Sequence, residues 1–166
     1  MEIMHRRIGL WLMIAAGVCL HAGASDGPIE RATLRGLKAV RVIVDPPDEE
    51  LRRAGVTAAK LVAMVEKRME KAGIPTDSNA VEFIGMRITA AHAKKKSSAV
   101  CLTLAVYQNV NLTRDPKIKA TTETWSGESV VLAPPELLFE AVSNTVNQLV
   151  DQFADAYRIA NPKEQK

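Results

Sequence analysis

Histidine and cysteine are well suited to nucleophilic chemistry, and beyond residue 24 this chain contains one of each, His92 and Cys101. In a catalytic pair the imidazole would take the thiol proton, and a third side chain would orient the ring. His92 precedes the polar sequence AKKKSS without an evident orienting partner, whereas Cys101 lies in an alternating, strand-like stretch. We therefore interpret them as an exposed loop histidine and a half-buried strand thiol. The alternative is a hydrolase in which His92 works with Cys101 or with a carboxylate.

Metal and cofactor chemistry find little support. A zinc site needs three or four ligands, which the available histidine and cysteine do not supply. The sequence DPPDEE at Asp45–Glu50 concentrates four carboxylates, but it lacks the ligand spacing and turn glycine of a calcium loop. Glycine-rich phosphate loops and the G-x-S-x-G and H-E-x-x-H motifs are also missing. The sequence predicts no metal, no cofactor and no enzymatic activity.

The charged residues point away from nucleic acid. The chain carries 22 Lys and Arg against 19 Asp and Glu, a net charge of +3, whereas nucleic-acid binding usually requires a strongly basic face. Lys94, Lys95 and Lys96 form the only lysine run and offer a weak site for anionic lipid. Lipid recognition usually takes about 4–8 basic residues. We therefore expect these lysines to keep a hairpin tip soluble.

Residues 1–24 have the three parts of a secretory signal. The basic start is MEIMHRR, the apolar stretch is IGLWLMIAAGVCL, and HAGAS supplies small residues for cleavage between Ala24 and Ser25. The apolar stretch is shorter than the roughly 20 residues that cross a bilayer, so cleavage is favoured over an uncleaved anchor. The protein is expected in the periplasm or outside the cell.

The positions of the two cysteines argue against lipidation and against an intramolecular disulfide. Cys19 follows Val18 within the apolar stretch, whereas a lipidated cysteine follows a small residue at the end of such a stretch. Removal of the leader leaves Cys101 alone, so we predict no intramolecular disulfide even in an oxidising compartment.

Hydrophobic periodicity predicts six elements in one domain. Residues 25–35 read as a flexible lead, 36–162 as a single α+β domain, and 163–166 as a tail. Strands are expected at 37–47, 80–93, 99–114 and 118–133, the last one broken at Gly127, and helices at 57–72 and 134–161. Thr57 and Gly73 are suited to cap the first helix.

The order β-α-β-β-β-α predicts a two-layer α+β sandwich. The third strand has one apolar and one mixed face, which is typical of an antiparallel sheet covered on one side only. Both helices would cover the apolar face of a mostly antiparallel, four-stranded sheet.

Trp125 lies in the sequence TTETWSGESVV, within the predicted fourth strand. Strict alternation places it on one face with Thr121 and Glu123, and neither face is strongly apolar, so we expect an edge strand. Trp125 either fills the end of the core or anchors a partner-binding surface together with Thr121 and Glu123.

Methionines suggest a second role. Met64, Met69 and Met86 could line a space between helix and sheet that holds a small apolar ligand, although methionine more often fills gaps in a core. A periplasmic carrier of a small apolar ligand is therefore an alternative function.

Three phrases carry a resemblance to a known group. VEKRMEKAGI (Val65–Ile74), ATTETWS (Ala120–Ser126) and LVDQFADAYRIANPK (Leu149–Lys163) resemble small exported bacterial proteins of uncharacterised function. That group supplies no catalytic residues. The stretch between Ile74 and Phe83 is shorter here than in that pattern.

The order of elements also resembles small periplasmic modules of envelope assembly. Examples are the lipopolysaccharide-assembly lipoprotein, the N-terminal domain of the Tol-system propeller protein and auxiliary lipoproteins of lipid transporters. The resemblance implies a non-enzymatic binding or scaffolding module that acts with an envelope protein, and it concerns the fold alone.

Overall fold

The structure is a computed structural model that describes residues 25–93 and 97–162. The leader expected at 1–24, the lysines Lys94, Lys95 and Lys96, and the tail at 163–166 lie outside these residues. The elements are α1 (Pro28–Ala32), β1 (Arg41–Val44), α2 (Glu49–Arg53), α3 (Ala58–Ala72), β2 (Phe83–His92), β3 (Ser98–Leu112), β4 (Asp115–Ala133), the 3-10 helix η1 (Pro135–Leu137) and α4 (Leu138–Ala160).

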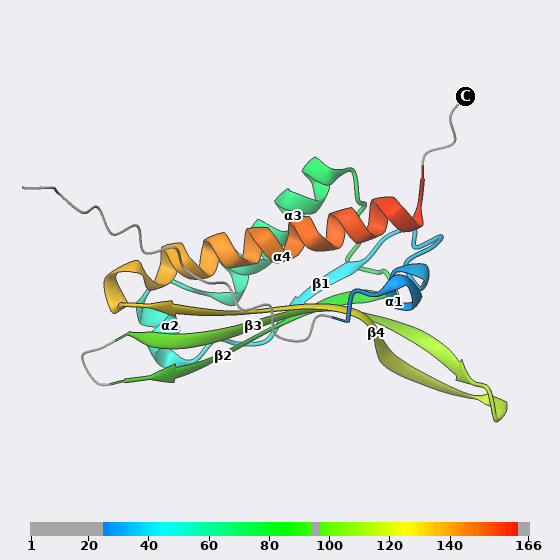
Figure 1. Ribbon diagram of the computed structural model, residues 1–166, viewed down its shortest axis with the longest axis horizontal. Helices are drawn as coiled ribbons and strands as arrows, with labels where there is room; N and C mark the ends of the chain where they lie inside the picture. Colours follow the sequence, from blue (N-terminus) through cyan, green and yellow to red (C-terminus); the bar gives the residue numbers. More distant parts are fainter. Residues whose placement is uncertain (1–24, 94–96, 163–166) are drawn as a thin grey trace, which may run out of the picture.

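The molecule has two layers, a four-stranded sheet and the helices α3 and α4 on one of its faces (Figure 1). The strand order is β1-β2-β3-β4; β1 and β2 are parallel, and the other two pairs are antiparallel. The predicted α+β class is therefore confirmed. The helices α2 and α3 form the crossover connection that the parallel pair β1–β2 requires.

The core lies between the sheet and the two long helices. Side chains of β2 and β3 that alternate toward the helices are almost fully buried, among them Ile84, Met86, Leu102 and Leu104. The helix α3 begins where the Thr57 hydroxyl accepts a hydrogen bond from the Lys60 N–H, and it ends at Gly73, whose φ of 73° is left-handed. Both predicted caps are confirmed. Among the described residues, no helix combines the length and apolarity needed to cross a bilayer.

The N-terminal lead differs from its prediction. Residues 25–35 were expected to be flexible, yet α1 forms within them and Leu34 is fully buried in the core. Asn161, just after α4, holds this segment by hydrogen bonds to the Gly36 N–H and the Leu34 carbonyl. The polar composition of the lead concealed one apolar residue that packs against the end of α4.

Strand β4 also differs from its prediction, because its register against β3 shifts at Thr124 and again between Lys119 and Asp115, and not at Gly127. Val106 pairs with Trp125, but the next residue of β3, Tyr107, pairs with Glu123, so Thr124 is an extra residue. Gly127 continues the strand and lies close to α4, where an added Cβ would be 3.3 Å from a Leu149 methyl carbon. The bulge at Thr124 shifts the alternation of all side chains beyond it.

As a consequence, Trp125 and Glu123 lie on opposite faces of the sheet. Trp125 lies opposite Val106 on the helix-covered face and is fully buried. Its ring packs against Phe153, with the two ring centroids 5.3 Å apart. Glu123 is opposite Tyr107 on the other face. The prediction that Trp125 shares a face with Thr121 and Glu123 is wrong, and the core alternative for Trp125 is favoured over the surface alternative.

Beyond the bulge, β3 and β4 leave the body of the protein as a two-stranded hairpin (Figure 1). We call residues 109–120 the arm. The first nine residues of β4, from Asp115 to Glu123, are all exposed. The turn predicted at Asp115–Pro116 lies two residues earlier, at Thr113 and Arg114, and Asp115 already belongs to β4.

Replacement of Trp125 should expose how much stability its burial provides. Trp125→Ala leaves a large cavity beside Phe153, so the free energy of unfolding should fall by about 3–5 kcal/mol in urea denaturation. Leu132→Ala on the same strand is the control, because Leu132 is 73% exposed and surface changes usually stay within about 0.5 kcal/mol. Equal stability of the two variants would contradict the core role.

Candidate functional site

The face of the sheet opposite the helices has no covering layer in the described part of the chain. Because side chains alternate along each strand, the register assigns this open face row by row. One row is Arg41, Phe83, Tyr107 and Glu123; the next is Ile43, Gly85, Ala105 and Ser126; then come Arg87, Thr103 and Glu128, followed by Thr89, Cys101 and Val130, and finally Ala91, Ala99 and Leu132. The register therefore gathers aromatic, charged and apolar side chains on one surface.

A hollow of about 320 Å³ lies at one end of the open face. Its lining includes the small residues Gly85 and Ala105 of the second row, together with Phe83 and Tyr107 of the first. The remaining lining residues are Ile43, Asp45, Met86, Arg87, Thr103, Glu123 and Glu128. A volume of this size matches the lower end of small-ligand pockets, or one or two side chains of a partner.

Phe83 and Tyr107 are stacked across β2 and β3. Their ring centroids are 4.8 Å apart with an angle of 11° between the rings. The Tyr107 ring also lies over Gly85, where an added Cβ would come within 2.8 Å of it. Gly85 is therefore the residue that lets an aromatic ring lie flat on the sheet, an arrangement that stabilises a glycine within a strand.

The hollow carries an excess of negative charge. Three carboxylates, of Asp45, Glu123 and Glu128, line it against the single guanidinium of Arg87. Arg87 already donates to Asp45 at 3.3 Å, whereas neither Glu123 nor Glu128 forms an ion pair within residues 25–93 and 97–162. Arg41 lies at the margin, 5.8 Å from the Phe83 ring centroid. The two glutamates and the aromatic pair together suit a cationic group with an apolar stem.

The other end of the open face is apolar. Leu132 is 73% exposed and Val130 42% exposed, and the row pairing places Ala91, Ala99 and Cys101 beside them. Both large side chains belong to β4, which is an edge strand as predicted. This apolar end is a second region suited to protein contact, because antiparallel sheets usually present polar residues to water.

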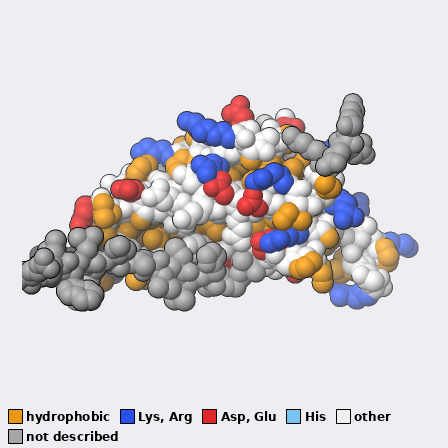
Figure 2. Space-filling model, turned by 45° about the horizontal axis from the view of Figure 1, so that its top comes forward, with side chains coloured by type: hydrophobic (Ala, Val, Ile, Leu, Met, Phe, Trp, Pro, Cys, Tyr) orange, Lys and Arg blue, Asp and Glu red, His pale blue; other side chains and the backbone are white. Residues whose placement is uncertain are grey.

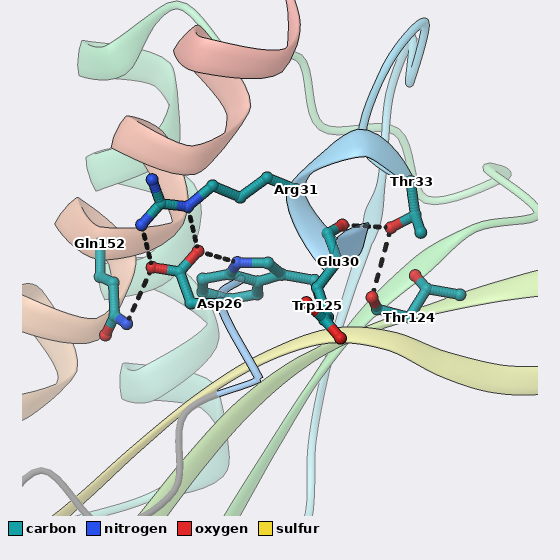
Figure 3. A network of polar contacts seen from close by, with 7 residues as sticks. All are labelled: Asp26, Glu30, Arg31, Thr33, Thr124, Trp125 and Gln152. Carbon is teal, nitrogen blue, oxygen red and sulfur yellow. Dashed lines mark hydrogen bonds and ion pairs between the residues drawn. The ribbon is translucent and has the colours of Figure 1, made fainter. Parts of the chain in front are cut away.

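Trp125 is fixed by a polar network at the N-terminal segment (Figure 3). Its indole N–H donates to the Asp26 carboxylate at 2.7 Å, and Arg31 donates two hydrogen bonds of 2.8 Å to the same carboxylate. Gln152 of α4 is a weaker donor at 3.4 Å. The network joins α1, β4 and α4, so its role is to hold the N-terminal segment onto the core.

These donors set the ionisation of Asp26. Partial burial alone would raise the pKa of Asp26, but the hydrogen bonds from Arg31, Trp125 and Gln152, together with the charge of Arg31, lower this pKa below its usual value. The charged carboxylate is thus the form that the folded state prefers.

His92 does not contact Cys101, and its imidazole ring belongs to a polar cluster with Ser98 and Asp48. His92 is opposite Ser98, whereas Cys101 is an odd number of residues further along β3, so the imidazole and the thiol lie on opposite faces of the sheet. The His92 ring contacts the Ser98 hydroxyl at 2.8 Å through Nδ1 and the Asp48 carboxylate at 2.9 Å through Nε2. A Cys101–His92 nucleophile is therefore excluded by geometry.

The order Ser98, His92, Asp48 is that of a proton relay, but the hydroxyl is not accessible. Ser98 is 1% exposed, and a nucleophile must contact its substrate. Asp48 also accepts the Leu51 N–H at 2.9 Å as the N-cap of α2. Partial burial would raise the pKa of Asp48, but the Leu51 N–H and the His92 ring lower it below its usual value. The cluster therefore fixes α2 to the β2–β3 hairpin.

The remaining candidate residues are spread over the molecule. Met69 and Met86 are buried in the core, and Met64 is half-buried beside a shallow surface hollow with Lys67, Arg68, Lys71 and Asn147. The three methionines thus do not line one space. Thr121 is exposed near the arm and donates to Asn109 at 2.7 Å. Among the described residues, no group of three or more His, Cys, Asp or Glu side chains is placed to hold a metal ion.

Sequence reasoning missed the hollow and the network of Asp26. The stacked Phe83 and Tyr107 are far apart in the chain, and only the hairpin register brings them together. The single available signal was Gly85, an isolated glycine within a strand, which often marks a close approach by another group. Asp26 and Arg31 were assigned to the flexible lead and so gave no signal.

The acid sensitivity of the fold should depend on Asp26. Because the folded-state pKa is lowered, the stabilisation is complete above the ordinary carboxyl pKa and disappears as the pH falls through the folded value. Asp26→Asn should therefore lower the free energy of unfolding by about 1–3 kcal/mol at pH 7, and the difference from wild type should shrink below about pH 4.

Urea denaturation at a series of pH values measures this difference. Asp151→Asn is the matched control, since its carboxylate is 50% exposed in an ion pair with Arg68 and surface pairs contribute about 0–1 kcal/mol. A difference between wild type and Asp26→Asn that stays constant down to acidic pH would contradict the role of the charged carboxylate.

Comparison with known proteins gives distant structural similarities. No family model matches this chain, and no curated protein matches it. A dodecamer of a PelC variant from Paraburkholderia phytofirmans has a TM-score of 0.41 and 9% identity, over 72% of this chain and 85% of that one. A minor lipoprotein from Acinetobacter baumannii has a TM-score of 0.35 and 11% identity, over 74% of this chain and 92% of that one.

Proposed function

We propose that this chain is a non-enzymatic binding module of the bacterial cell envelope and that it docks a protein partner on the open face of its sheet. The observation that carries the proposal is the composition of that face. A solvated sheet face is usually polar, but here Leu132 and Val130 are exposed at one end and Phe83 and Tyr107 form a stacked pair at the other. Exposed apolar patches rimmed by charge are typical of protein interaction sites.

The edge of β4 adds a second means of contact. β4 pairs with β3 on one side, and on its outer side the Ser126 N–H donates to the Ser25 carbonyl at 3.2 Å. From Glu128 to Ala133 no strand of the described chain lies along this outer edge. An extended segment of a partner could add to the sheet there, with its side chains against Val130 and Leu132.

The cell envelope is proposed as the location because of the leader pattern and the resemblances in sequence. Residues 1–24 have the composition of a secretory signal, with cleavage expected near Ala24–Ser25. The order of elements predicted from the sequence resembles that of small periplasmic assembly modules, and a role like that of the lipopolysaccharide-assembly lipoprotein or the Tol-system domain is part of the proposal by analogy.

A binding role is favoured over the two alternatives by the placement of their residues. The Cys101 form of the hydrolase alternative needs an accessible nucleophile near His92, but Cys101 lies on the opposite face of the sheet and Ser98 is buried. In the carboxylate form, His92 contacts Asp48 at 2.9 Å, but this carboxylate is already used as the N-cap of α2. The carrier alternative needs Met64, Met69 and Met86 around one space, but they are divided between the core and a surface hollow.

The location can be tested by the mass of the exported protein. We expect the periplasmic fraction to contain a chain that starts at Ser25, because the small-residue site precedes it. Intact-mass spectrometry of that fraction measures the cleavage position directly. A chain that keeps residues 1–24 in the membrane fraction would contradict cleavage and favour an anchor.

The docking surface can be tested by site-specific photo-crosslinking in cells. A crosslinker at Leu132 should yield a discrete adduct with an envelope protein, whereas one at Glu70, which is exposed on α3, should not. The captured protein, once purified, should bind the wild-type chain and lose affinity about tenfold or more for Leu132→Asp, because burial of an unpaired charge costs more than about 1.4 kcal/mol.

Crosslinking from Leu132 and Glu70 can also contradict the proposed docking surface. Equal adducts from Leu132 and Glu70 would indicate chance contact, and no adduct from Leu132 would remove the open face as the docking surface. Wild-type affinity in Leu132→Asp would do the same. Thermal unfolding of Leu132→Asp should resemble wild type, because this side chain is 73% exposed.

A further inference from the structure

The arm has no support from the rest of the described molecule. Residues 109–120 extend beyond the helices (Figure 1), and every residue of β4 from Asp115 to Glu123 is exposed. An isolated two-stranded hairpin is only marginally stable in water. The arm would therefore gain order from a second surface that covers one of its faces.

The chemistry of the arm is that of a cationic ligand with apolar parts. It carries Arg114, Lys117 and Lys119 against the single carboxylate of Asp115, and Ile118 between the lysines is 44% exposed. The Asp115 carboxylate is already used locally, because it accepts the Lys117 backbone N–H at 3.1 Å. Figure 2 shows basic side chains standing out at the end of the molecule that bears this hairpin.

The hollow on the open face has the complementary chemistry. Glu123 and Glu128 line it without an ion pair among the described residues, and the Tyr107 ring that covers Gly85 is part of the same lining. A lysine could lie with its stem along this ring and its ammonium group between the two glutamates. The arm thus presents the type of side chain for which the hollow is shaped and charged.

The arm of one molecule cannot enter its own hollow. It is the direct continuation of β3 and β4, the strands that carry Tyr107, Glu123 and Glu128, and it leads away from them (Figure 1). The contact must therefore join two molecules through two different surfaces. Such head-to-tail contacts repeat, and they produce a closed ring or an open filament according to the angle between neighbours.

We propose that the arm of one molecule binds in the hollow of a second copy of this chain, with Lys117 and Lys119 facing Glu123 and Glu128. The inference rests on the proposed function, because it takes the open face as a binding surface. It assigns one end of that face to self-assembly and leaves the apolar end, at Val130 and Leu132, to the envelope partner. Each assembled copy would present one such apolar end.

Charge reversal tests the contact, with sedimentation velocity of the protein purified from cells as the measurement. The wild-type protein should form species larger than a monomer as its concentration rises, and salt should weaken them, since exposed charges are screened beyond about 8 Å at physiological ionic strength. Lys117→Glu with Lys119→Glu, and separately Glu123→Lys with Glu128→Lys, should each raise the concentration needed for association about tenfold or more.

The decisive sample is an equal mixture of the two reversed proteins. A reversed arm then meets a reversed hollow, and the wild-type hollow of the first protein meets the wild-type arm of the second. Association should therefore return in the mixture at concentrations at which each reversed protein alone stays monomeric. Lys67→Glu with Lys71→Glu, which changes exposed lysines of α3, is the matched control and should associate as wild type does.

Several outcomes would overturn the proposal. They are a wild-type protein that stays monomeric at every concentration and salt, reversed proteins that associate normally, and a mixture that does not recover while both components melt as wild type does. The envelope partner is tested separately, by crosslinking from Leu132. A monomeric protein that still yields the Leu132 adduct would remove self-assembly alone, and an assembly without that adduct would remove only the envelope partner.

Discussion

One extra residue in strand β4 determines how the two faces of the sheet are used. Because Thr124 is added opposite the step from Val106 to Tyr107, Trp125 reaches the core while Glu123 reaches the open face. The bulge is held from both sides: the Thr124 hydroxyl donates to Gln108 at 2.7 Å, and the Thr124 carbonyl accepts from Thr33 at 3.3 Å. Bulges also bend and twist the strand that carries them, which agrees with the arm leaving the body at this point (Figure 1).

The buried indole then fixes the N-terminal segment. A Trp125 ring in the core requires an acceptor for its N–H, and Asp26 supplies that acceptor while Arg31 neutralises the carboxylate. The Ser25 carbonyl receives the Ser126 N–H one residue further along β4. The bulge, the ring and the first described residues therefore form one unit, so that a change in any of them would alter the edge of the sheet that the others define.

The main elements could be predicted from the sequence because their signals are local. Thr57 and Gly73 bound α3 as expected, and the apolar positions of α4 recur at helical spacing. The role of Trp125 could not be predicted in the same way. Alternation assumes an unbroken strand, and no residue type marks a bulge at Thr124. Leu34 was missed for a related reason, since Ile29 and Leu34 are too few apolar residues to establish a period in a polar segment, and the hydrogen bond that Asn161 donates to the Leu34 carbonyl comes from the far end of the described chain.

The open face shows how binding properties can arise from structural needs. Gly85 weakens β2 as a strand residue, and the Tyr107 ring compensates by covering it. The ring that covers Gly85 is also a lining residue of the hollow, so the same aromatic side chain supports the strand and forms part of the wall of the hollow. The stability of the strand alone explains Tyr107, but it does not explain why Glu123 and Glu128 line the hollow beside this ring. Other carboxylates, such as Glu66 and Glu70 on α3, also form no ion pair among the described residues, but they do not lie beside stacked aromatic rings. The combination of two carboxylates with the stacked pair of Phe83 and Tyr107 is the reason for assigning the hollow a ligand of positive charge rather than a purely structural role.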